Sequence, residues 1–120
     1  MAGLVAAARA RELGARPVVL EKGDRPGGSM LLSSGVVWRH RSFDQFREDC
    51  PAADPALQRR IIDELDEALS WLGSLGAPAL TRETGNPRTV GVRFETGGLT
   101  EALVRAAGDV RLKEPFSEAE

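Results

Sequence analysis

The first 35 residues change their hydrophobic pattern twice. Small and apolar side chains recur at helical spacing over residues 2–13, and Gly14 predicts the end of this helix. The residues that can share its apolar face are Leu4, Val5, Ala8 and Leu13. Residues 17–20 form an uninterrupted apolar run, which is too short for a helix and typical of a buried parallel strand. Glu21 ends this run, and a loop rich in Gly and Pro follows.

The middle of the chain predicts two helices. Ser42 with Gln45 predicts a capped start for a short helix through Asp49. Asp54 followed by Pro55 predicts the start of a longer one that continues to about Gly76. Its apolar stripe consists of Leu57, Ile61, Leu65, Leu69 and Leu72. Because the opposite side is charged, this helix packs on a core and has no expected chemical role.

The last part of the chain is dense in Gly and Pro over residues 77–98. We expect a loop region there with one short strand at residues 89–94. A third helix is predicted at 99–107, ended by Gly108, and a strand at 110–112. Helices therefore alternate with short apolar strands. This order predicts an α/β fold.

The spacing between Gly3 and Glu21 suggests a specific kind of α/β fold. Dinucleotide-binding domains place the last glycine of G-x-G-x-x-G at a helix start, and an acid for the ribose follows about 20 residues later. Glu21 comes 18 positions after Gly3 and ends a predicted strand. The first strand and the first two glycines would precede Met1. We therefore expect a partial Rossmann-like, doubly wound domain that lacks its first strand.

Four short motifs give a resemblance to one family. They are Gly3-Leu4 with Ala6-Ala7-Ala8, Val19-Leu20-Glu21-Lys22, Gly27-Gly28-Ser29 and Ser33-Ser34-Gly35. Together they resemble the N-terminal flavin domain of the fumarate reductase/succinate dehydrogenase flavoproteins, a family that includes 3-ketosteroid dehydrogenases. The resemblance is strong over residues 2–38 and weaker but continuous beyond. It implies that residues 1–120 are the front part of an FAD-binding domain.

The resemblance also implies a cofactor and a reaction. The cofactor is FAD, and hydride passes between it and a small organic substrate. The residues that we assign to FAD are Gly3, Glu21, Lys22, Gly27, Gly28, Ser29, Ser33, Ser34, Gly35 and, near the adenine, Phe116. In the resembling family the catalytic acids and bases come largely from a capping domain and later segments. We therefore name no catalytic residue, and we expect the chain by itself to be inactive.

Several conspicuous residues have simpler interpretations. Gly27 and Gly28 would form an ordinary turn if they did not directly follow an acid-terminated strand. Trp38 is expected to be a buried core residue. His40, the only histidine, lies between two arginines, and we expect it in a solvated basic loop. The single cysteine, Cys50, is expected to be a buried or idle thiol without a redox role, and we name no metal ligands.

Composition and charge limit the classes of protein to which this chain can belong. A net charge of −2 gives no argument for binding nucleic acid or an anionic membrane, and no apolar run approaches a membrane span. With one cysteine and no recognisable signal peptide, the expected compartment is a reducing cytoplasm. Heavy use of Ala and Arg is typical of a GC-rich bacterial gene. Two alternatives to a flavin domain stay open: a gene remnant without activity, and a small structural or binding protein.

Overall fold

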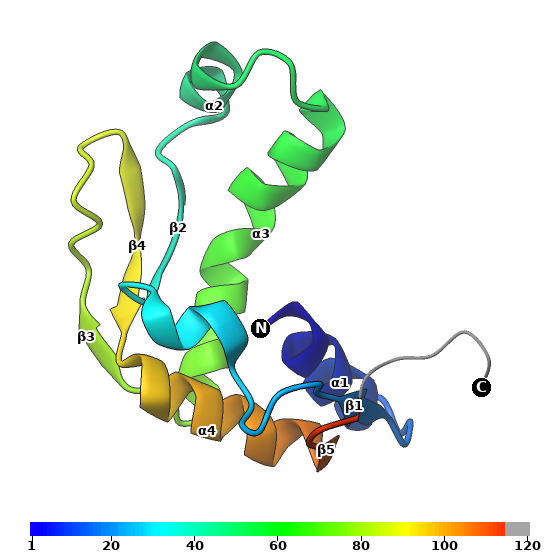
Figure 1. The fold of residues 1–120 in the computed structure, drawn as a ribbon. Coiled ribbons are helices and arrows are strands. Elements are labelled where there is room, and N and C mark those ends of the chain that lie inside the picture. Colours follow the sequence, from blue (N-terminus) through cyan, green and yellow to red (C-terminus); the bar gives the residue numbers. More distant parts are fainter. Residues whose placement is uncertain (115–120) are drawn as a thin grey trace.

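The computed structural model describes residues 1–114 as a mixed α/β fold with two small sheets. The elements in chain order are α1 (Ala2–Glu12), β1 (Val18–Leu20), the 3₁₀ helix η1 (Gly28–Leu32), β2 (Val36–His40), α2 (Phe43–Asp49), α3 (Pro55–Ser74), β3 (Ala79–Thr81), β4 (Thr89–Phe94), α4 (Thr96–Ala107) and β5 (Asp109–Arg111). In Figure 1 the three-stranded sheet lies on the left, β1 and β5 lie at the lower right, and α4 runs along the bottom. The predicted α/β class is confirmed, and a doubly wound arrangement stays a prediction.

The two sheets differ in strand direction. β1 pairs with β5 in parallel, with Val19 opposite Val110. The other sheet has the order β2-β4-β3 and is antiparallel, with Val37 opposite Val92. Because opposite residues in a strand pair share a face, Val37 and Val92 both point toward the core.

Helix α4 forms the centre of the hydrophobic core. Leu99, Leu103 and Ala107 recur on one face of it and are 0–1% exposed, as their spacing predicts. Helix α1 packs against this helix and buries Leu4, Ala7 and Ala8. The alanines let two helix backbones approach closely, so a small core is filled without large side chains.

The helix ends follow the sequence signals. The Ser42 hydroxyl accepts a hydrogen bond from the Gln45 amide at 3.2 Å, and the Asp54 carboxylate accepts one from Ala56 at 2.8 Å. Gly14 and Gly108 follow α1 and α4 with φ of +90° and +86°. Only half of the expected capping box forms at Ser42, because the side-chain oxygen of Gln45 is buried without a partner in the described chain.

Two elements differ from the prediction in residues 77–98. Helix α4 begins at Thr96 and not at Leu99, because the Glu95 carboxylate accepts hydrogen bonds from the Gly97 and Gly98 amides. Strand β3 was not predicted. Its three residues carry no alternating pattern, and they are extended because they pair through a bulge with β4.

Burial corrects four expectations. The predicted apolar stripe of α3 does not pack on the core along its whole length, since Leu57 and Ile61 are 60% and 42% exposed. Leu13 does not share the apolar face of α1, because it caps the helix and is 72% exposed. Trp38 is 49% exposed and not a core residue, because Val37 faces the core and adjacent strand residues point to opposite faces. Strand β1 is not buried, because β5 is its only partner in residues 1–114; Val18 and Leu20 are nearly half exposed.

Candidate functional site

A cavity of about 610 Å³ opens where the N-terminus of α1, the end of β1 and the glycine loop meet. Six of the predicted site residues line it, namely Gly3, Glu21, Gly27, Gly28, Ser29 and Ser33. They come from three segments of the chain. Its volume lies within the range of small-molecule sites.

The N-terminal end of α1 forms one wall. Met1 precedes the helix without a side-chain cap, and the first turn contains no acidic residue. The first amides of a helix have no partner within the helix, and together with the helix dipole they attract anions. A Cβ placed on Gly3 would meet nothing within 4 Å, so the space beside this backbone is open.

Glu21 lies at the carboxyl end of β1, half-buried at the cavity wall. Its Oε1 accepts a hydrogen bond from the Gly23 amide at 2.9 Å. Backbone bonds to Arg111 and Glu114, each of 2.8 Å, fasten this residue to the neighbouring strand and the segment after it. Oε2 has no hydrogen bond within residues 1–114, so the carboxylate keeps an acceptor for a ligand.

Gly27 and Gly28 form the turn between the loop and η1. Gly27 has φ +112°, and a Cβ there would lie 2.8 Å from the Leu31 side chain and 3.2 Å from Thr100. Gly28 has φ +54°, and a Cβ there would meet nothing within 4 Å. The first glycine is therefore required by packing, whereas the second keeps open space beside the cavity.

The segment 33–35 forms a tight turn after η1. The Ser33 hydroxyl donates to the Met30 carbonyl at 2.8 Å and accepts from the Gly35 amide at 3.1 Å. Gly35 is buried against the end of β4, where its carbonyl accepts from the Phe94 amide at 2.9 Å. Ser33 alone of the three lines the cavity, and Ser34 and Gly35 do not.

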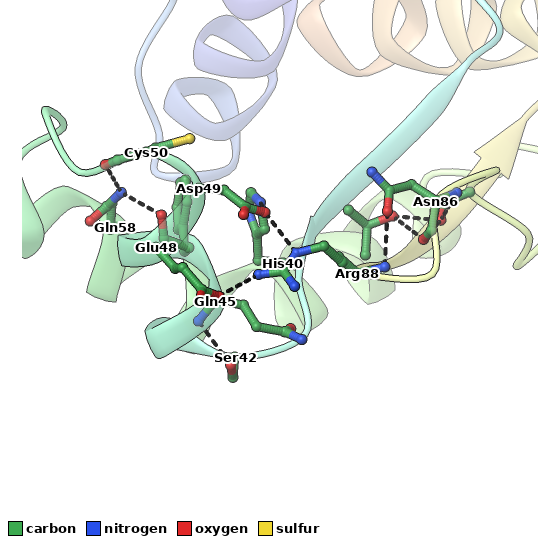
Figure 2. A network of polar contacts seen from close by, with 12 residues as sticks. His40, Ser42, Gln45, Glu48, Asp49, Cys50, Gln58, Asn86 and Arg88 are labelled. Carbon is green, nitrogen blue, oxygen red and sulfur yellow. Dashed lines mark hydrogen bonds and ion pairs between the residues drawn. The ribbon is translucent and has the colours of Figure 1, made fainter.

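In residues 1–114, none of the groups with shifted pKa values lines this cavity. Figure 2 shows Asp49 bound by both His40 and Arg88. The Arg88 Nε donates to Asp49 Oδ2 at 2.9 Å, and His40 Nε2 lies 3.1 Å from the same oxygen. The hydrogen bond from Arg88 lowers the pKa of Asp49, and His40 acts in the same direction. A second bond of 2.7 Å joins Arg88 to Glu48.

His40 corrects the expectation of a solvated basic loop. Its residue is 6% exposed, and its ring stacks on Phe46 with centroids 4.6 Å apart. Because a carboxylate only accepts, Nε2 carries the proton toward Asp49, while the buried Nδ1 has no partner in the described chain. The arrangement fastens α2 and the turn before β4 to the end of β2. It is a structural network.

Comparison with known families decides which kind of α/β domain this is. Residues 1–119 match the family described as an FAD binding domain. The chain belongs to this family. A search among curated proteins and one among solved structures each found no match. FAD is therefore the cofactor of this domain, and an FAD binding domain is typical of flavin-dependent oxidoreductases.

The groups that line the cavity of this FAD binding domain are complementary to the adenosine diphosphate half of the cofactor. Uncapped amides at the start of α1 suit phosphate, and a carboxylate with an unused oxygen suits ribose hydroxyls. The backbone beside Gly3 and Gly28 is bare, so a ligand can approach both. These residues fit the group.

The FAD binding domain does not bring all the predicted residues to the cavity. Lys22 is exposed and does not line it, and Phe116 lies outside the described residues. The lining that sequence reasoning missed is largely apolar: Leu4, Val19, Leu20, Pro26, Met30 and Val110. Leu4, Val19 and Leu20 belong to the motifs that carry the family resemblance, but an apolar side chain in a predicted helix or strand gives no sign of whether it lines a cavity or the core.

Residues 1–114 contain neither a candidate metal site nor a candidate membrane-spanning helix. No group of three or more potential metal ligands gathers there. No helix in that part of the chain is both long and apolar enough to cross a bilayer.

Proposed function

We propose that this chain binds FAD through the cavity beside α1 and that it serves an oxidoreductase of the fumarate reductase/succinate dehydrogenase type. The single observation that supports this proposal is the meeting of Gly3, Glu21 and Gly28 around one cavity. These residues are far apart in the sequence, and each has the property that one part of FAD requires. The four motifs that resemble the flavoprotein family supply the subfamily.

Within the proposal, each group has a physical role. The amides at the start of α1 hold the pyrophosphate, and Glu21 accepts hydrogen bonds from the adenosine ribose. Gly28 and Ser29 offer backbone and hydroxyl groups at the mouth of the cavity. When bound, FAD supplies hydride exchange with an organic substrate. The share of this chain is to bind and orient the cofactor.

A comparison of three ligands tests this assignment. The purified chain is titrated with FAD, ADP and FMN, and binding is followed by calorimetry. FAD and ADP both contain the adenosine ribose and the diphosphate, whereas FMN contains neither. We expect FAD and ADP to bind and FMN to bind at least tenfold more weakly, because FMN lacks the adenosine ribose that Glu21 would hold. Equal binding of all three ligands, or of none, would overturn the proposal.

A further inference from the structure

Ser33 lines the cavity, and hydrogen bonds within residues 30–35 fix its position. The Ser33 hydroxyl bridges the Met30 carbonyl and the Gly35 amide at 2.8 and 3.1 Å. Phe94 holds the far end of the turn through the Gly35 carbonyl. Ser34 lies between Ser33 and Gly35, and the hydrogen bonds of these two residues do not involve the Ser34 carbonyl.

A side chain of the antiparallel sheet binds that carbonyl. Arg93, on β4, donates from Nε to the Ser34 carbonyl at 3.0 Å. This is the only hydrogen bond of its side chain in residues 1–114, and it joins positions 59 apart in the sequence. Arg93 is exposed and does not line the cavity. Its influence on a ligand must therefore act through Ser34.

We propose that Arg93 is a positioning residue for the cofactor cavity. Its bond to Ser34 ties the cavity wall to the rigid pairing of β2 and β4, and so determines where the neighbouring Ser33 lies. The planar guanidinium suits this role because Nε donates in one fixed direction. The inference rests on the proposed function, since it assumes that the Ser33 wall meets FAD. An exposed arginine adds little to overall stability, so its effect is expected in binding and not in unfolding.

Arg41 provides a matched control. Its Nε also donates to a backbone carbonyl, that of Pro87, at 2.6 Å, and it is also exposed. Arg41 does not line the cavity. Arg93→Met places a methyl group where the Nε donor lies and should weaken FAD binding about three- to tenfold, which corresponds to one net hydrogen bond. Arg41→Met should bind like the wild type, and Arg93→Lys, which keeps a donor, should lie between the two.

Two further measurements separate positioning from a general loss of structure. Amide hydrogen exchange at Gly35 should accelerate in Arg93→Met and stay unchanged in Arg41→Met, with similar thermal midpoints in both. In FAD binding, Arg93→Met and Ser33→Ala should be non-additive, because both act on the same wall.

The outcomes are distinguishable. If the wild type binds FAD while Arg93→Met binds equally well and Gly35 exchanges at the wild-type rate, the inference is overturned and the proposed function stands. Additive effects of Arg93→Met and Ser33→Ala would also overturn it. A wild type that binds no FAD would overturn both the inference and the proposed function.

Discussion

The backbone of Gly35 lies directly against the carbonyl of Phe94. The Phe94 amide donates to the Gly35 carbonyl at 2.9 Å, and a Cβ built on Gly35 would overlap the Phe94 carbonyl oxygen. Gly35 also has φ +76°, which side chains rarely adopt. The fold therefore requires a glycine at the third position of the Ser-Ser-Gly motif, whether or not a ligand is bound.

Replacing this glycine should therefore destabilise the fold. Gly35→Ala is expected to lower the free energy of unfolding by about 2–5 kcal/mol, because backbone strain adds to overlap with β4. Gly85→Ala is the matched control. It has a similar φ of +79° but nothing within 4 Å of the new Cβ, so strain alone should cost about 1–2 kcal/mol. Equal losses in urea unfolding would refute the close approach to Phe94.

The helices could be predicted from sequence because their signals are local. Ser42, Asp54 and Gly108 act on amides or carbonyls within a few residues, so their effect is visible in the sequence. β3 and the position of His40 depend on partners far along the chain, because β3 pairs with β4 and His40 pairs with Thr89. No local pattern reports such partners. The basic flanks of His40 instead suggested solvent.

The network at Asp49 should make stability depend on acidity. The hydrogen bond from Arg88 holds the pKa of Asp49 below its ordinary value of 3.8. A lowered pKa in the folded state stabilises the fold above the unfolded value, and this contribution is lost as the pH falls through the folded value. Asp49→Asn should therefore reduce the loss of stability between about pH 6 and about pH 3 in urea unfolding.

Asp63→Asn is the control for this prediction. Asp63 is an exposed carboxylate on α3 with no hydrogen bond in the described chain. The Asp63→Asn substitution removes the same charge as Asp49→Asn, but it leaves the contacts of Arg88 and His40 unchanged. The two variants should differ at neutral pH, where Asp49→Asn is the less stable, and converge in acid. Parallel curves at every pH would show that Asp49 gains nothing from its partners.

The uncovered edge of β1 should promote association. In residues 1–114 this strand pairs on one side with β5 alone, and Val18 is 46% exposed. An unpaired apolar edge can add a strand from another molecule. Sedimentation velocity should show concentration-dependent association that Val18→Lys reduces. Leu57→Lys adds the same charge to an exposed apolar site on α3 and should leave association unchanged. A wild type that is monomeric at all concentrations would contradict this prediction.

The candidate site could be predicted where its residues carry chemical signals. Gly3 and Glu21 belong to a spacing with a known mechanism, Gly28 belongs to a glycine motif of the resembling family, and the three meet at the cavity. Lys22 does not line it, although it follows Glu21 directly. Arg93 had no signal at all, because its partner Ser34 is 59 residues away. Sequence motifs therefore pointed to residues that can contact a ligand directly. They gave no sign of a residue such as Arg93, which is proposed to hold a neighbouring segment in place.

The central claim is that Glu21 holds the ribose of FAD, and one comparison of variants tests it directly. Glu21→Gln can keep the acceptor for the Gly23 amide while removing the negative charge. Asp24→Asn removes a charge from an exposed position in the same loop that does not line the cavity. In fluorescence titrations with FAD, Glu21→Gln should weaken binding about ten- to a hundredfold, as expected for one charge-assisted hydrogen bond. Asp24→Asn should bind like the wild type. Equal FAD affinities for Glu21→Gln and the wild type would contradict the account.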